Sequence, residues 1–101
     1  MNYTSTRSDK KVRETYSLLN GLAADCGLYV PASFPRRSIT YKDIAGKSYQ
    51  EIAAIVLSKF FTDFTEAELK DMINAAYNTK NFSTDDIAPL HSLLERISVL
   101  E

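Results

Sequence analysis

The sequence contains few of the residues from which common active sites and cross-links are built. It has one cysteine, Cys26, and one histidine, His91. A lone cysteine cannot form an internal disulfide, and this pair is too little for a zinc site or a recognisable Cys–His catalytic pair. The three glycines, at positions 21, 27 and 46, match neither the dinucleotide-binding pattern nor the phosphate-binding loop. Nucleotide binding is therefore disfavoured, and we assign no catalytic, cofactor-binding or metal-binding residue.

Long apolar runs and leader-like features are also missing. No apolar run approaches the roughly 18 residues typical of a membrane span, and residues 1–5 lack the layout of a secretory signal. Together with the lone cysteine, this favours a reducing cytoplasmic compartment. With 101 residues, of which 45% are hydrophobic and 25% charged, we expect one domain, residues 1–101, with a single core.

The chain is organised around residues 21–31, which read GLAADCGLYVP. Gly21 stands where a helical apolar pattern ends, Gly27 precedes a short apolar run, and Pro31 stops that run. This order predicts a helix end, a polar turn and then a strand. We expect Cys26 to be an inert thiol within the turn.

The N-terminal segment predicts a short strand and a helix. Residues 3–6 are aromatic and β-branched enough to form a strand. Ser8 or Asp9 is suited to cap a helix over residues 10–20. The helical spacing predicts a core face of Val12, Tyr16 and Leu19 and a solvent face of Lys10, Lys11, Arg13 and Glu14.

Two capping boxes mark the strongest helices. Ser48 is followed three residues later by Glu51, and Thr65 by Glu68. Helical apolar stripes follow each box, so we expect core-facing helices over about 49–61 and 66–77. The intervening segment 32–47 reads as a connection with one helical turn near 41–45.

The C-terminal segment predicts a hairpin of two short strands, 90–94 and 97–101. We expect His91 to be a half-exposed residue of the first strand. The chain stops inside an apolar alternation without a polar tail, which we interpret as a truncation. The predicted fold is α+β: about three helices packed on a small, mostly antiparallel sheet made from the N-terminal strand and the C-terminal strands.

Charge is distributed unevenly along the chain. Residues 1–50 carry eight Lys and Arg against four Asp and Glu, whereas residues 51–101 carry four against nine. The basic half predicts either contact with the acidic helix containing Glu66, Glu68 and Asp71 or a route for an anionic substrate. An alternative is a self-contained binding module in which the basic half engages a polyanion or a protein partner. The basic residues concerned are Arg7, Lys10, Lys11, Arg13, Arg36 and Arg37.

Several segments in order resemble threonine synthase. Residues 3–7 (YTSTR), then a helix running into residues 21–31, are similar to the start of that family. The similarity continues through residues 48–53, 69–77, 87–90 and 97–101. Family members often have Gly where Ser8 and Cys26 stand, which bears on the local backbone conformation. Arg7 is a candidate for packing or an anion contact.

The resemblance implies an N-terminal structural domain of a pyridoxal-phosphate-dependent enzyme that converts O-phosphohomoserine and water to threonine and phosphate. In the family, the last strand leads to the lysine that holds the cofactor, and this sequence ends before that point. The resemblance therefore implies that the cofactor and substrate belong to the full enzyme, that this chain alone is inactive, and that its partners are the remaining domains of its own chain. It implies no nucleic acid or membrane partner. Apolar surface left uncovered would favour weak self-association.

Overall fold

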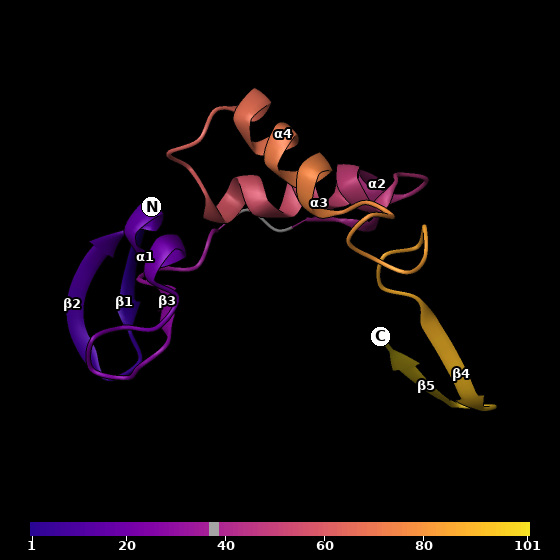
Figure 1. Cartoon of the computed structure of the whole chain (residues 1–101), viewed down its shortest axis with the longest axis horizontal. Coiled ribbons are helices and arrows are strands. Elements are labelled where there is room, and N and C mark those ends of the chain that lie inside the picture. Colours follow the sequence, from indigo (N-terminus) through magenta and orange to yellow (C-terminus); the bar gives the residue numbers. More distant parts are fainter. Residues whose placement is uncertain (37–38) are drawn as a thin grey trace.

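Figure 1 shows three parts arranged along the chain: an N-terminal sheet with a short helix, a group of helices, and a hairpin at the C-terminal end. This computed structural model describes residues 1–36 and 39–101. Arg37, which the sequence placed in the basic half, lies outside the described residues. Within the described residues, no helix has the length and apolar character needed to cross a membrane.

The N-terminal sheet has three antiparallel strands in the order β2-β1-β3. The predicted first strand is confirmed as β1 (Asn2–Ser5), and β3 (Tyr29–Pro31) follows the glycine turn as expected. The predicted helix 10–20 is only half right, because Ser8–Arg13 forms strand β2 and the helix α1 spans Glu14–Asn20. β2 is an edge strand whose lysines face water, so pairing with β1 prevails over the local helical pattern.

The predicted core face of α1 is wrong. Tyr16 is 51% exposed and Leu19 is 88% exposed, while the buried residues of this helix are Glu14 and Ser17. The shorter helix ends as expected at Gly21, which has a φ of 63° and donates its N–H to the Ser17 carbonyl.

Three further helices follow: α2 (Tyr41–Ile44), α3 (Tyr49–Phe60) and α4 (Glu66–Ala76). Both predicted capping boxes are confirmed. The amide of Ser48 donates to the Glu51 carboxylate at 2.8 Å, and the amide of Thr65 donates to the Glu68 carboxylate at the same distance. Helices α3 and α4 pack against each other, and α4 supplies the buried residues Leu69 and Ile73.

The predicted C-terminal hairpin is confirmed as β4 (Leu90–Leu94) and β5 (Ile97–Leu100). It forms a second, separate sheet, so the expectation that the C-terminal strands share a sheet with β1 is wrong. Within residues 1–36 and 39–101, four helices and two small antiparallel sheets confirm the α+β class.

Aromatic side chains connect the N-terminal sheet to the end of α3. The Tyr3 ring stacks on Phe61 with centroids 6.3 Å apart, and Phe61 meets Phe64 edge-on. The Tyr3 hydroxyl also donates to the Phe60 carbonyl at 2.9 Å. Burial, with a smaller effect of the nearby Glu14 charge, raises the pKa of Tyr3, so its hydroxyl keeps this donor proton at neutral pH.

Glu14 is the most completely buried large side chain, although the sequence placed it on the solvent face. Its carboxylate accepts from the terminal ammonium group of Met1 at 2.5 Å, the amide of Thr62 at 3.0 Å and the amide of Asp63 at 2.5 Å. Burial alone raises the pKa of Glu14, but the bonds from the ammonium group and the two amides outweigh it and lower the pKa. Beside it, Arg13 pairs with Asp63 at 2.7 Å.

We expect Glu14→Gln to lower the free energy of unfolding at pH 7 by about 3 kcal/mol, because it leaves the buried donors without their charged acceptor. The folded-state pKa of Glu14 lies below its ordinary value of 4.5. Its contribution is therefore complete above about pH 4.5 and is lost as the pH falls through the folded-state pKa. The difference between parent and variant in urea unfolding should shrink towards pH 3.

The matched control is Glu95→Gln, the same change at an exposed position in the hairpin turn, which should leave the free energy of unfolding nearly unchanged. An equal loss in both variants, or a Glu14→Gln effect of the same size at pH 3 and pH 7, would contradict this role for Glu14.

Candidate functional site

The polar turn that we define as residues 23–28 is held against the end of β1 by side-chain hydrogen bonds. The Ser5 hydroxyl donates to Asp25 Oδ1 at 2.7 Å, and the Gly27 amide donates to the same oxygen at 2.9 Å. The Leu28 amide donates to the Thr6 hydroxyl at 3.0 Å. These bonds, the one from Ser5 most strongly, lower the pKa of Asp25 and keep it ionised at neutral pH.

The turn requires glycine at position 27 because the backbone passes very close to β1. A Cβ atom at Gly27 would stand 2.0 Å from the Ser5 hydroxyl and 2.9 Å from Asp25 Oδ1. Its neighbour Cys26 has a φ of 63°, in the left-handed region that favours glycine, and its side chain is exposed. Cys26, which stands where members of the resembled family often have glycine, therefore occupies a position at which the backbone is strained.

Arg7 lies beside this turn. Its guanidinium Nη1 donates to the Asp25 carbonyl at 3.4 Å, and its amide donates to the Ser5 hydroxyl at 3.1 Å. The side chain is otherwise exposed. Arg7 therefore packs on the polar turn, which is one of the two roles considered for it, and its anion contact stays a prediction.

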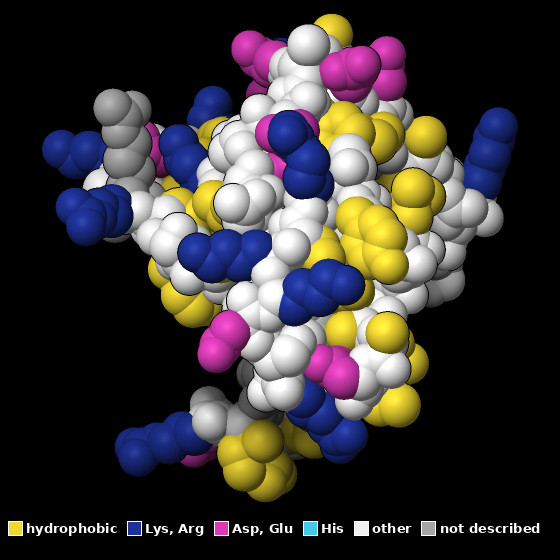
Figure 2. Space-filling view, turned by 90° about the vertical axis from the view of Figure 1, so that its left-hand side faces the viewer, with side chains coloured by type: hydrophobic (Ala, Val, Ile, Leu, Met, Phe, Trp, Pro, Cys, Tyr) yellow, Lys and Arg dark blue, Asp and Glu magenta, His cyan; other side chains and the backbone are white. Residues whose placement is uncertain are grey.

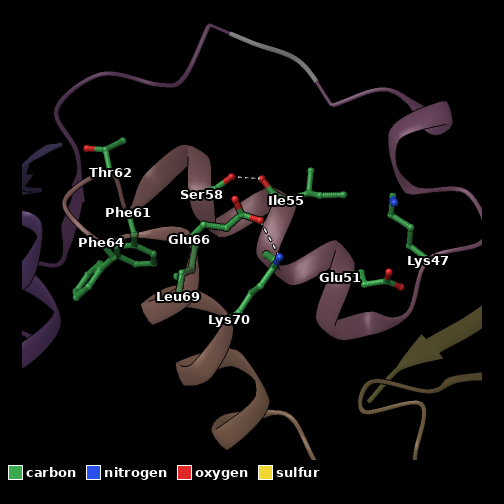
Figure 3. A pocket seen from close by; sticks show the side chains of 11 residues that line it. Lys47, Glu51, Ile55, Ser58, Phe61, Thr62, Phe64, Glu66, Leu69 and Lys70 are labelled. Atoms are coloured by element: carbon green, nitrogen blue, oxygen red, sulfur yellow. Dashed lines mark hydrogen bonds and ion pairs between the residues drawn. The ribbon is translucent and has the colours of Figure 1, made fainter.

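A cleft of about 580 Å³ lies between α3 and α4 and is shown in Figure 3. Its lining mixes aromatic side chains at one end with charged side chains elsewhere. Lys70 is bound to Glu66 at 2.7 Å, and this contact raises the pKa of Lys70. The Ser58 hydroxyl donates to the Ile55 carbonyl at 2.9 Å. Lys70 thus stays protonated and the Ser58 hydroxyl is engaged with a backbone carbonyl, so neither of these two side chains is set up as an activated nucleophile.

Other chemistry-bearing residues are dispersed. Among residues 1–36 and 39–101, no group of three or more His, Cys, Asp or Glu side chains is arranged to hold a metal ion. His91 is confirmed as a half-exposed residue of the first hairpin strand: its side chain is 55% exposed, and its Nε2 lies 3.3 Å from the Glu101 carboxylate at the open end of the hairpin.

The face shown in Figure 2 carries many Lys and Arg side chains, with acidic and hydrophobic side chains among them. Arg13 makes an ion pair with Asp63, in the loop before α4, rather than with the acidic residues of α4 itself. Of those acidic residues, Glu66 pairs within its own helix. Arg36 is exposed.

The sequence carried a signal for the role of Asp25 but none for that of Glu14. An Asp two residues before a Gly is typical of a turn in which the carboxylate accepts the later amide, as Asp25 does from Gly27. A glutamate at a helix start, in contrast, ordinarily faces water. Its burial depends on donors nearly fifty residues away.

Comparison with known proteins identifies a consistent set of similar molecules. Residues 2–77 match the family model described as threonine synthase N terminus. The chain is 35% identical to threonine synthase of Corynebacterium glutamicum, over 96% of this chain and 22% of that protein. It is 38% identical to human threonine synthase-like 1, over 84% of this chain and 12% of that protein.

The solved structures agree. The PLP-bound threonine synthase from Brucella melitensis matches with a TM-score of 0.81 and 36% identity, over 100% of this chain and 22% of that chain. Yeast threonine synthase matches with a TM-score of 0.72 and 29% identity, over 88% of this chain and 18% of that chain. The chain thus spans about a fifth of the length of these threonine synthases.

We expect Cys26→Gly to raise the free energy of unfolding by about 0.5 to 1 kcal/mol, because relief of the left-handed strain exceeds the entropy that glycine adds to the unfolded chain. Cys26→Ser should match the parent, because the side chain is exposed. Thermal or urea unfolding measures both.

Gly27→Ala is the matched contrast one residue later, and we expect it to lose about 2 kcal/mol through its clash with Ser5. A large loss in Cys26→Ser, or a Gly27→Ala variant as stable as the parent, would contradict this description of the polar turn.

Proposed function

Because the chain belongs to the threonine synthase family, as the match of residues 2–77 to its N-terminal model shows, we propose that it serves as the N-terminal structural domain of a working threonine synthase. The proposed reaction is the conversion of O-phospho-L-homoserine and water to L-threonine and phosphate. The observation that carries the proposal is the match of the entire chain to a solved, PLP-bound threonine synthase at a TM-score of 0.81.

The cofactor proposed for the full enzyme is pyridoxal phosphate, which supplies the electron sink for chemistry at the amino-acid carbons. Attachment of this cofactor requires a lysine in a site that favours its neutral form. The lysines of this chain do not fit that role, since six are exposed and the remaining one, Lys59, is only half-buried, in the last turn of α3. We therefore assign cofactor attachment to the remainder of the full enzyme.

The domain's own contribution is structural. The polar turn holds the end of β1 against the segment that leads into β3. The Glu14 contacts join the N-terminal sheet to the residues that follow α3, and α4 packs along α3. A part fixed in this way can cover an active-site entrance and exclude water, which protects reactive intermediates. The proposed partners are the remaining domains of the same enzyme, and the proposed location is the cytoplasm.

The polyanion-binding alternative lacks support. The relatives reported above are threonine synthases or a threonine synthase-like protein. In Figure 2, acidic and hydrophobic side chains stand among the Lys and Arg side chains of the face shown, and Arg13 of the basic half is engaged with Asp63. A nucleic-acid interface is built from basic side chains that contact successive phosphates.

The direct test is to supply O-phosphohomoserine to the purified full-length enzyme that carries this domain, with pyridoxal phosphate present. We expect threonine and phosphate to appear in equal amounts, because each turnover releases one of each. The 101-residue chain alone should release no phosphate and retain no visible absorbance of bound cofactor after dialysis. A full-length enzyme that binds the cofactor yet forms no threonine would contradict the proposed reaction.

Steering of the phosphorylated substrate by the basic half gives a second test in the full enzyme. We expect neutralising Arg36 and Arg37 together to weaken apparent substrate affinity several-fold at low salt and hardly at all at high salt, because screening removes long-range attraction. Lys80→Gln, at an exposed position in the acidic half, is the control. Unchanged affinity at low salt in the double variant would rule steering out.

A further inference from the structure

The hairpin β4–β5 carries apolar side chains on both of its faces. The register pairs Leu90 with Leu100 and His91 with Val99. Because successive strand residues point to opposite faces, these two pairs lie on opposite sides of the hairpin. A hairpin that covers a core on one side and faces water on the other has apolar residues on one face alone. This pattern is that of a strand pair enclosed between two layers.

All strand residues of the hairpin are nevertheless exposed in this chain. Leu90 and Leu100 are each 69% exposed, and Leu94 is 65% exposed. Figure 1 shows the hairpin projecting away from α3 and α4, with no further strand beside either of its outer edges. An isolated two-stranded hairpin is at best marginally stable in water, and neither strand carries the lysines that protect natural edge strands.

We propose that this hairpin is the element by which the domain docks on the remainder of a threonine synthase, with both faces covered and at least one outer edge paired there. The inference rests on the proposed function. The solved Brucella melitensis enzyme matches all of this chain, hairpin included, and the match uses only 22% of that enzyme's chain. The remaining polypeptide of such an enzyme is large enough to supply a layer on each side of the hairpin.

A second copy of this chain fits the hairpin less well. Hairpin-to-hairpin contact in a symmetric pair would cover one face or pair one edge in each copy and leave the other face in water. Enclosure on both sides needs a larger partner that supplies layers above and below. When the larger partner is absent, as in the 101-residue chain alone, we expect the exposed hairpin to cause only weak self-association.

The test compares amide hydrogen exchange of residues 90–100 in two proteins. One is the 101-residue chain alone. The other is a chimera in which this chain replaces the matching first part of the Brucella melitensis enzyme. We expect exchange at least roughly 100-fold slower in the chimera, because covered and paired strand amides open only through rare local unfolding. Residues 66–76 of α4 are the internal reference in both proteins.

Charged substitutions test the two faces separately. Leu100→Asp and Val99→Asp should leave unfolding of the 101-residue chain nearly unchanged, since both side chains are exposed there. In the chimera each should lower the apparent melting temperature clearly, because each buries an unpaired charge. Lys80→Asp, at an exposed position before the hairpin, should be neutral in both proteins.

The hairpin proposal is overturned if residues 90–100 exchange equally fast in both proteins, or if their protection in the chimera appears only at concentrations where it dimerises. If the first chimera folds poorly, a second chimera in which only the hairpin is exchanged takes its place. If neither chimera folds while the parent Brucella melitensis enzyme does, that result also counts against docking. A chimera with a protected hairpin that forms no threonine would leave docking intact and count against the proposed function.

Discussion

The arrangement of the N-terminal half depends on the buried carboxylate of Glu14. This one side chain gathers the chain's first residue and the two amides that follow α3, and so joins the sheet to the helices through hydrogen bonds. A buried carboxylate is tolerable only when its oxygens are satisfied, and three close N–H donors meet that condition. The stacked rings of Tyr3 and Phe61 add an apolar contact between the same two parts of the chain.

The polar turn applies a second constraint at the other end of β1. Asp25 Oδ1 receives both the Ser5 hydroxyl and the Gly27 amide, which brings the start of β3 against the strand it must pair with. The approach is so close that a side chain at Gly27 has no room. These local bonds fix the backbone of the polar turn, and the turn sets the position of β3 relative to β1.

Local features were predictable from the sequence, and long-range ones were not. Both capping boxes depend on residues three apart, and both helices begin where those boxes indicate. The sequence predicted a helix where strand β2 forms. Residues 8–13 become a strand because they pair with β1, and the spacing of apolar residues along one segment carries no information about such pairing. Glu14 was assigned to solvent for the same reason, since its donors lie on distant segments. In the polar turn, Asp25 and Gly27 were locatable because their bond is local.

The distribution of apolar residues explains why so much of this fold faces outward. Within the described residues, five hydrophobic side chains are buried while sixteen large ones are exposed. The exposed set is not scattered, since six of its members belong to the hairpin and others lie on α1 and the loops around it. A self-sufficient domain of this size would turn such residues inward, because each buried CH₂ contributes about 0.8 kcal/mol. In this chain, local hydrogen bonds specify much of the backbone conformation, while many apolar side chains stay exposed. Such an exposed apolar surface suits a domain that gains its remaining stabilisation by packing against a larger enzyme, as the proposed function requires.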